Sequence, residues 1–261
     1  MNHSKYTLIT GASTGIGYEL AHCFARAKHN VVLVARNEEK LSHLANKLET
    51  EFQVKALIIP QDLTQPNAPN IIYETTRNKN IHIDILVNNA GIGANGEFAK
   101  IPYEKEMALI QLNIVSLVAL CKLYIQDMAK QQSGKILNVA STAAFQPGPY
   151  MSSYYASKAF VLHFSEGLYQ EYKKHGITIS TLCPGATRTP FFENAEMGTS
   201  SLATSIVMMN AKKVAEIGYK GLMQNKAVII PGLINKILAQ SVRFTTRFLV
   251  RQIAAKLNFS R

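Results

Sequence analysis

Short apolar runs alternate along the chain with longer stretches in which apolar residues recur every three or four positions. Six runs are apolar almost throughout, as strands covered on both faces of a sheet are, and they occupy residues 6–10, 31–35, 54–60, 83–89, 134–141 and 177–184. The stretches between them, such as 16–30 and 37–52, have the amphipathic period of helices. This alternation predicts an α/β fold with a doubly wound parallel sheet.

No linker rich in Pro, Gly or Ser divides the 261 residues, so we expect a single domain over 1–261. The three cysteines form no CxxC pair and the seven histidines no HxxxH pair, which predicts no structural metal. Few residues precede the first glycine and no apolar run has the length of a membrane span. We therefore expect a cytoplasmic protein.

The net charge of +11 is concentrated at the C-terminal end of the chain. Residues 211–261 contain ten Lys or Arg and one acid, Glu216, whereas the first 210 residues contain 18 basic and 16 acidic side chains. The near-neutral body argues against a nucleic-acid-binding face spread over the fold. The question of a partner therefore moves to the C-terminus.

The first predicted strand leads into TGASTGIG at 10–17, a glycine-rich turn before a predicted helix. Glycines allow a sharp turn and a close approach of backbone to a pyrophosphate, and the helix N-terminus offers N–H groups to the phosphates. The spacing is GxxxGxG and not GxGxxG, so a plain strand–helix turn is the alternative. The functional hypothesis assigns cofactor binding to Gly11, Ser13, Thr14, Gly15, Ile16 and Gly17.

In a dinucleotide fold the residue at the end of the second strand faces the adenosine ribose. An acid there binds the 2′-OH of NAD, whereas a basic residue accommodates the 2′-phosphate of NADP. Here VVLVARNEEK has Arg36 and no acid before Glu38, which favours NADP(H) through a charge-assisted pair. The alternative for Arg36 is a solvated residue at the start of the next helix.

The stretch SSYYASK at 152–158 pairs two tyrosines with a lysine one helical turn away. Carbonyl reduction needs a proton donor for the carbonyl oxygen, and a tyrosine hydroxyl can be that donor. A nearby ammonium suits a tyrosine to this role because it lowers the pKa of the phenol. Helical spacing alone brings Lys158 close to both Tyr154 and Tyr155. Ser141, at the end of a predicted strand, can hydrogen-bond the substrate oxygen where charge develops.

Five motifs run in order along roughly residues 5–190: TGASTGIG (10–17), NNAG (88–91), Ser141 thirteen residues before Tyr154, Tyr154-x-x-x-Lys158, and PGATRT (184–189). Together they resemble the short-chain dehydrogenase/reductase family. The resemblance implies a Rossmann-like fold and hydride transfer between a nicotinamide and a carbonyl or alcohol carbon. It selects Tyr154 as the catalytic acid and leaves Tyr155 to packing, with a neighbouring subunit as one possible partner.

The resemblance implies roles for further residues. Lys158 would also bind the nicotinamide ribose, and Asn113 would anchor a water in a proton relay. The cofactor contacts that it implies are Tyr154, Lys158, Asp62 at the adenine, Asn89, Ala90 and Gly91, and Pro184, Gly185, Thr187 and Thr189, the last at the carboxamide. Structural alternatives stand beside these roles: a cap for Ser141, local bonds for Asn113, an N-cap for Asp62 and a loop hydroxyl for Thr189.

Two segments lie outside these motifs. Residues 187–205 are small and polar around two phenylalanines, and the resemblance makes them a substrate loop, with a flexible insertion as the alternative. Residues 232–261 predict a C-terminal basic amphipathic helix in which Arg243, Arg247 and Arg251 form one stripe. Such a helix suits an anionic membrane surface, an acidic carrier protein, another subunit, or a solvated face over the core.

The whole pattern predicts an NADP(H)-dependent oxidoreductase that interconverts a carbonyl and an alcohol. The resemblance is closest to reductases related to hydroxysteroid and ketoacyl-thioester reductases, which favours a lipophilic ketone or acyl substrate; Thr14 stands where ketoacyl-carrier reductases commonly have Arg or Lys. The alternative is a non-catalytic NADP(H)-binding regulator, disfavoured because Asn113, Ser141, Tyr154 and Lys158 are all present. Family habit suggests a homodimer or homotetramer.

Overall fold

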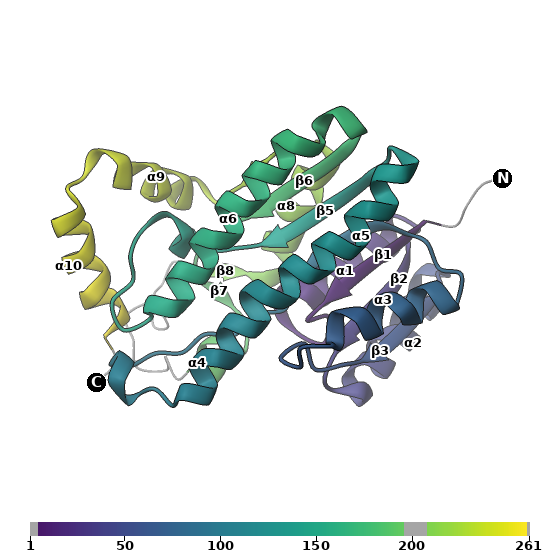
Figure 1. Ribbon diagram of the computed structural model, residues 1–261, viewed down its shortest axis with the longest axis horizontal. Helices are drawn as coiled ribbons and strands as arrows, with labels where there is room; N and C mark the ends of the chain where they lie inside the picture. Colours follow the sequence, from purple (N-terminus) through teal and green to yellow (C-terminus); the bar gives the residue numbers. More distant parts are fainter. Residues whose placement is uncertain (1–4, 196–207, 260–261) are drawn as a thin grey trace.

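Seven parallel strands form the central sheet in the order β3-β2-β1-β4-β5-β6-β9 (Figure 1). The computed structural model describes residues 5–195 and 208–259. The strands are β1 Tyr6–Thr10, β2 Asn30–Ala35, β3 Ala56–Pro60, β4 Ile83–Asn88, β5 Gly134–Val139, β6 Ile177–Leu182 and β9 Val228–Ile229. The first six confirm the strands predicted from the apolar runs, and the fold is a Rossmann-like doubly wound sheet in one domain.

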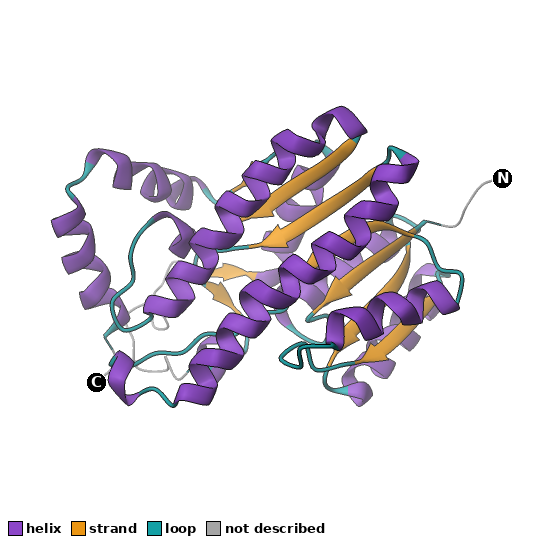
Figure 2. Ribbon diagram, viewed as in Figure 1, coloured by secondary structure: helices purple, strands orange, loops and turns teal. Residues whose placement is uncertain are grey.

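Helices cover both faces of the sheet (Figure 2). One layer holds α3 Ala68–Asn78, α5 Leu117–Gln131 and α6 Ser152–Tyr172, and the other holds α1 Gly15–Arg26, α2 Glu38–Phe52 and α8 Ala211–Met223. Successive strand residues enter opposite layers: Leu8 packs with the first and Ile9 with the second, and both are fully buried. This double burial is why the strands are continuous apolar runs in the sequence.

Strand β1 lies between β2 and β4, so the order of the strands reverses beside it. In open α/β sheets, ligands bind at this point, outside the carboxyl ends of the strands. The segments that follow β1, β4, β5 and β6 carry the glycine turn, the rest of NNAG, Ser141 and PGATRT. The topology therefore gathers the sequence motifs at one edge of the sheet.

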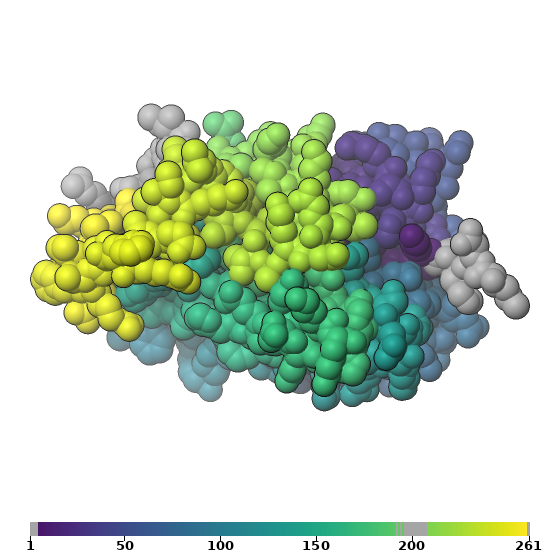
Figure 3. All heavy atoms as spheres, turned by 90° about the horizontal axis from the view of Figure 1, so that it is seen from above, coloured from purple at the N-terminus to yellow at the C-terminus, as the bar shows by residue number. Residues whose placement is uncertain are grey.

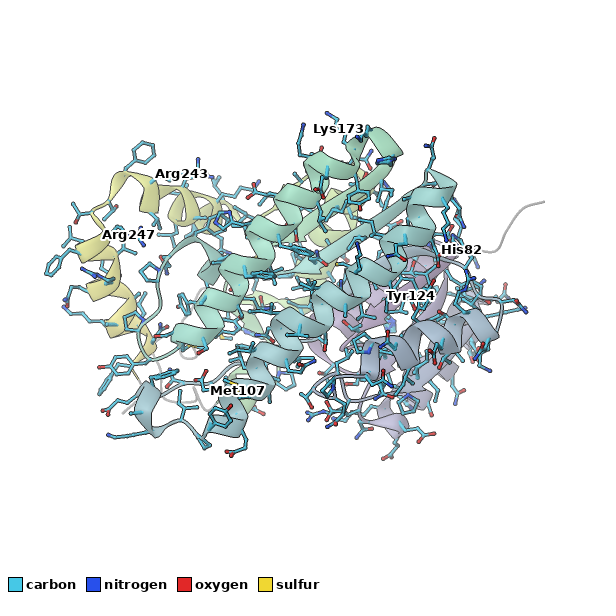
Figure 4. All side chains as sticks on the ribbon, in the orientation of Figure 1. His82, Met107, Tyr124, Lys173, Arg243 and Arg247 are labelled. Carbon is cyan, nitrogen blue, oxygen red and sulfur yellow. The ribbon has the colours of Figure 1, made fainter. Side chains whose placement is uncertain are left out.

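One helical stretch, Tyr103–Gln131, is long and apolar enough to cross a membrane by length and composition, contrary to the sequence expectation. It comprises α4 (Tyr103–Ile110), a π-helical segment η2 (Gln111–Ser116) and α5. Tyr124, labelled in Figure 4, is buried in the core against the sheet, and so is Leu120. The α5 part of the stretch is thus a core helix of this fold, whereas α4 and η2 also carry exposed apolar side chains.

The sequence analysis missed several short elements. They are β9, the two-stranded sheet of β7 (Thr187–Arg188) and β8 (Met209–Asn210), helix α7 (Phe191–Asn194), and the 3₁₀ turns η1 (Phe98–Lys100), η3 (Thr142–Phe145) and η4 (Lys173–His175). Strands of two residues are too short to show an apolar period. The expected substrate loop begins with β7 and α7, and its residues 196–205 lie outside the described ranges.

The C-terminal extension is helical, but the single arginine stripe expected along it is wrong. Helix α9 (Leu233–Ser241) and the 3₁₀ turn η5 (Val242–Phe244) are followed by an extended Thr245, and α10 (Arg247–Asn258) begins afresh. The physical reason is an N-cap: the Thr246 side chain accepts a hydrogen bond from the Leu249 amide at 3.5 Å. Arg243 therefore lies on a different element from Arg247, as Figure 4 shows.

Candidate active site

The glycine turn after β1 has the backbone that its glycines permit. Gly11 (φ 65°) and Gly15 (φ 58°) lie in the left-handed region, which favours glycine. A Cβ on Gly17 would collide with the Gly11 carbonyl oxygen and the Asn89 side chain, and one on Gly11 would lie 2.8 Å from Asn89 Nδ2. The turn thus leaves no room for side chains on its inner side and exposes the N-terminus of α1, a cradle of the kind that a dinucleotide pyrophosphate occupies.

Asn89, expected at the cofactor, holds the glycine turn in shape. Its Nδ2 donates to the Thr10 carbonyl oxygen at 3.0 Å and to the Gly11 carbonyl oxygen at 3.2 Å. The Thr10 hydroxyl in return accepts from the backbone N–H groups of Asn89 and Ala90, both at 3.0 Å. The structure therefore gives Asn89 a structural role, while direct contact of Asn89, Ala90 or Gly91 with a cofactor remains a prediction.

Ser141 and Tyr154 lie close together, as their spacing of thirteen residues in the sequence predicted. Ser141 follows β5 and caps η3, with its Oγ 3.1 Å from the Ala143 amide nitrogen and 3.4 Å from the Pro184 carbonyl oxygen. The Ser141 hydroxyl lies close enough to the Tyr154 hydroxyl to lower the pKa of that phenol. The cap that was the structural alternative for Ser141 is therefore present, and its catalytic role remains a prediction.

Lys158 lies one turn further along α6, with its ammonium at the site. Its Nζ donates to the Val139 carbonyl oxygen at 2.9 Å and lies 5.7 Å from the centre of the Tyr154 ring. Burial lowers the pKa of Lys158 from 10.5 to about 8. The side chain still carries its charge at neutral pH, beside the phenol on which it was expected to act.

The pKa of Tyr154 does not follow the sequence expectation. Burial raises it above the ordinary value, the nearby Ser141 hydroxyl opposes that rise, and Tyr155 adds to it. The Lys158 ammonium donates its hydrogen bond to the Val139 carbonyl oxygen. Tyr154 is therefore held as a neutral phenol, the form that can donate a proton to a carbonyl oxygen.

Asn113 lies in the π-helical segment η2 and is almost fully buried. Its Oδ1 accepts from the Ile92 amide at 3.0 Å, and its Nδ2 donates to the Ile92 carbonyl oxygen at 2.9 Å and to Ser157 Oγ at 3.1 Å. A Cβ on Gly91 would lie 3.2 Å from Asn113 Oδ1 and 3.3 Å from Lys158 Nζ. The structure thus brings Asn113 and Lys158 together around Gly91, and the water relay remains a prediction.

The PGATRT segment closes over the glycine turn. A Cβ on Gly15 would lie 2.9 Å from Thr189 Cγ2, so Thr189 stands directly against the turn. Thr187 is buried and donates to the Gly185 carbonyl oxygen at 2.9 Å, and the Pro184 carbonyl oxygen accepts from the Thr142 amide at 2.8 Å. These contacts shape the segment, while its contacts with a cofactor remain predictions.

Arg36 and Asp62 lie at the β2–β3 side of the crevice. Arg36 is exposed immediately after β2, and the Ala12 amide of the glycine turn donates to the Val34 carbonyl oxygen of that strand at 3.2 Å. Asp62 Oδ1 accepts from both the amide and the hydroxyl of Thr64 at 2.9 Å, which forms a local turn. The N-cap that was the alternative for Asp62 is wrong, because Asn67 is the N-cap residue of α3 and Asp62 makes a local turn; its adenine role remains a prediction.

The Tyr155 ring lies edge-on to that of Tyr154, with ring centres 6.1 Å apart, and its hydroxyl is bonded within its own chain. Its hydroxyl donates to Asn258 Oδ1 of α10 at 3.0 Å, and its ring packs over Gly148. Asn258 is fully buried and its Nδ2 also donates to the Pro149 carbonyl oxygen at 3.0 Å. The packing role expected for Tyr155 is confirmed, with the C-terminal helix as the partner.

Two features of the site escaped the sequence analysis. Ser157 joins Asn113 to α6: it accepts from Asn113 and donates to the Tyr154 carbonyl oxygen at 2.7 Å. The only sequence signal for this residue is its position directly before Lys158. An apolar cluster also forms beside Tyr154, whose ring centre lies 5.2 Å from that of Phe191. Its other members are Ala143, Met151, Tyr155 and Ala195.

The comparisons with known proteins agree with this geometry. The family model described as short chain dehydrogenase matches residues 5–199. The chain belongs to the short chain dehydrogenase family. Family membership makes it a nicotinamide-dependent oxidoreductase, as the resemblance in its motifs implied. The residues gathered at the carboxyl ends of β1, β4, β5 and β6 form the candidate active site.

The chain is also similar to individual members of the short chain dehydrogenase family. It is 38% identical over 190 residues to human 17-beta-hydroxysteroid dehydrogenase type 3, a match covering 71% of this chain and 60% of the human protein. Among solved structures, a short-chain dehydrogenase from Sphingobium yanoikuyae in complex with NADPH is 33% identical, with a TM-score of 0.84 over 94% of each chain. A bulky-bulky ketone specific alcohol dehydrogenase from Comamonas testosteroni is 32% identical, with a TM-score of 0.79 and the same coverage.

Proposed function

We propose that the protein is an NADP(H)-dependent reductase and dehydrogenase of a lipophilic carbonyl–alcohol pair. The observation that carries the proposal is the assembly of Ser141, Tyr154 and Lys158 at the carboxyl end of β5, with the Lys158 ammonium 5.7 Å from the Tyr154 ring centre and the Ser141 hydroxyl near enough to the phenol to affect its pKa. When bound, the nicotinamide supplies or accepts the hydride. In reduction, the Tyr154 hydroxyl donates its proton to the carbonyl oxygen while the Ser141 hydroxyl holds that oxygen in place.

Lys158 stabilises the charge that Tyr154 carries once its proton has left. Its ammonium is 5.7 Å from the Tyr154 ring centre and is charged below a pH of about 8. Asn113 holds the backbone of Ile92 and, through Ser157, the turn of α6 that carries Tyr154. We propose that Asn113 in addition anchors a water in the relay that returns a proton to the Tyr154 hydroxyl.

The preference for NADP(H) rests on Arg36. It follows β2 directly, is exposed, and has no acid beside it before Glu38. A guanidinium at this position pairs with a 2′-phosphate, and an acid at the strand end would repel it. The solved relative from Sphingobium is itself an NADPH complex. The ratio of kcat/KM for NADPH to that for NADH tests the preference, and a ratio below one contradicts it.

The lipophilic substrate rests on the apolar cluster beside Tyr154. Phe191 and Met151 line the side of the catalytic tyrosine, and Ala143 follows Ser141 in the same cluster. Small and apolar side chains there favour an uncharged, hydrophobic body on the carbonyl compound. The names of the relatives, a hydroxysteroid dehydrogenase and a bulky-ketone alcohol dehydrogenase, point the same way. The start of the expected substrate loop, with Phe191, belongs to this wall.

The decisive experiment measures NADPH oxidation against ketosteroids, bulky aryl ketones, 3-ketoacyl thioesters and ketoses, with Tyr154→Phe as the control. We expect turnover with one of the lipophilic classes and none with the variant. Turnover of ketoses alone contradicts the substrate class. Absence of all turnover together with intact NADPH binding supports the alternative function, a non-catalytic NADP(H)-binding regulator.

We further propose that the protein acts in the cytoplasm as a homodimer or homotetramer. Exposed apolar side chains on α4, η2 and α6 support self-association, namely Met107, Ile110, Val115 and Phe160. Such side chains are common in surfaces that a second subunit covers. Light scattering on the purified full chain measures the mass, and a monomer at micromolar concentration contradicts the proposal.

A further inference from the structure

The C-terminal segment 233–259 presents much of the exposed apolar surface of the described chain. It holds ten of the 18 exposed large apolar side chains there. Phe244 is the extreme case, 90% exposed at the break between α9 and α10. Figure 3 shows that the segment, in yellow, forms one end of the molecule. Monomeric proteins rarely leave such surface uncovered, and an extended patch marks an interaction site.

The same segment carries only positive charge. Five basic side chains are exposed on α9, η5 and α10: Lys236, Arg243, Arg247, Arg251 and Lys256. No Asp or Glu follows Glu216 in the sequence. None of the five forms an ion pair with a carboxylate within the described part of the chain. We call the exposed apolar and basic side chains of 233–259 the tail surface.

The inner side of α10 is fixed to the fold, so the tail surface has a defined outer side. Val250, Ala254 and Asn258 are spaced one turn apart and are all buried. Asn258 anchors the helix through Tyr155 and Pro149, and its carbonyl oxygen accepts from Asn95 Nδ2 at 2.8 Å. The exposed side chains on the rest of the helix are therefore presented outward on a held element.

We propose that the tail surface docks on an anionic lipid membrane. Apolar side chains such as Phe248 and Ile253 enter the interface between headgroups and acyl chains, and the neighbouring arginines pair with lipid phosphates and carboxylates. A second copy of this chain is a poor occupant, because a two-fold contact would set the five cations against five more. The apolar and basic side chains also interleave along two helices, which suits a deformable lipid surface.

Co-flotation of the full chain with vesicles tests the proposal. The vesicles are pure phosphatidylcholine, or phosphatidylcholine with about one-third phosphatidylserine, each at about 50 mM and about 500 mM salt. We expect binding to the anionic vesicles at low salt, loss at high salt, and little binding to phosphatidylcholine. Replacing Arg243, Arg247 and Arg251 by Gln should weaken binding on the order of a hundredfold, since each cation near the surface contributes about tenfold or less.

A matched variant separates the tail from total charge. Lys79, Lys173 and Lys174 are exposed outside the tail, and Figure 4 shows Lys173 at the opposite end of α6 from α10. Their replacement by Gln removes the same charge and should leave vesicle binding unchanged, with NADPH binding and the melting temperature as folding checks for both variants.

Three outcomes overturn the proposal. They are absence of binding by the unaltered chain, equal loss in the two triple variants, and a change from dimer to monomer on Phe244→Ser with Phe248→Ser. The third result would assign the tail surface to a second copy of the chain. Retention on an immobilised acidic carrier protein without any vesicle binding would likewise assign it to a protein partner and refute the lipid.

Discussion

Exchanging the two adjacent tyrosines for phenylalanine, one at a time, separates catalysis from stability. Tyr154→Phe removes the hydroxyl that lies near Ser141 and that we propose gives its proton to a carbonyl oxygen. General acid catalysis contributes about 10²- to 10⁴-fold, so kcat should fall by that amount. The Kd for NADPH should stay unchanged, because the glycine turn and Lys158 remain intact.

Tyr155→Phe should have the opposite effect. Its hydroxyl is buried against the fully buried Asn258, and removing it leaves Asn258 Oδ1 without its donor. An unsatisfied buried polar group costs about 1–3 kcal/mol, so the free energy of unfolding should fall by that amount. Turnover should stay within about threefold of the unaltered enzyme, because the ring and its packing are kept.

Steady-state NADPH oxidation and urea unfolding, measured on the same preparations, give both quantities. Tyr124→Phe is the matched control, since Tyr124 is buried in the core with its hydroxyl 3.0 Å from Thr76 Oγ1. It should cost stability like Tyr155→Phe and leave kcat alone. Loss of turnover in Tyr155→Phe with activity kept in Tyr154→Phe would refute the reasoning and shift the register by one residue.

Three further predictions concern Lys158, the glycines and Arg36. Burial lowers the pKa of Lys158 to about 8. Between about pH 8 and 10.5 the folded chain therefore binds fewer protons than the unfolded chain. The contribution of Lys158 to the free energy of unfolding rises with pH across that window. Lys158→Met should therefore raise the free energy of unfolding at pH 7 by up to about 3 kcal/mol, and this gain should be lost above pH 10.5. The same variant should lose turnover. Urea unfolding at several pH values checks the stability change, and a variant less stable than the unaltered chain at pH 7 contradicts it. Gly17→Ala should abolish NADPH binding, because its Cβ would collide with the Gly11 carbonyl oxygen. Gly167→Ala has open space around it on α6 and should raise the free energy of unfolding by about 0.5–1 kcal/mol. Calorimetric titration with NADPH and thermal melts distinguish the two variants, and equal effects would show that the turn tolerates a side chain. Arg36→Asp should lower kcat/KM for NADPH on the order of tenfold or more and spare NADH, as one charge-assisted pair is lost; an unchanged ratio would remove Arg36 from cofactor recognition.

The parts of the fold that the sequence predicts are those that local patterns determine. The six long strands are continuous apolar runs because both faces are buried, and the order of the motifs along the chain places them at one sheet edge. The hydrogen bonds of Asn89 and Asn113 were not predictable, because their partners Thr10 and Ile92 lie on other segments. The pKa of Tyr154 escaped for a similar reason: helical spacing brings Lys158 near the phenol but does not show how deeply the phenol is buried by other segments.

The C-terminal helix illustrates how a pattern can be right in composition and wrong in geometry. Its basic and apolar residues predicted one amphipathic helix, but Thr245 and Thr246 break the segment, and the cap at Thr246 sets a new helix with its own phase. The inward side of that helix is then decided by Asn258, whose partner Tyr155 lies 103 positions earlier in the sequence. Because Tyr155 adjoins Tyr154, α10 is bonded to the helix that carries the proposed catalytic tyrosine. A change on the outer, tail-surface side of α10 should leave turnover intact as long as this inner anchor holds.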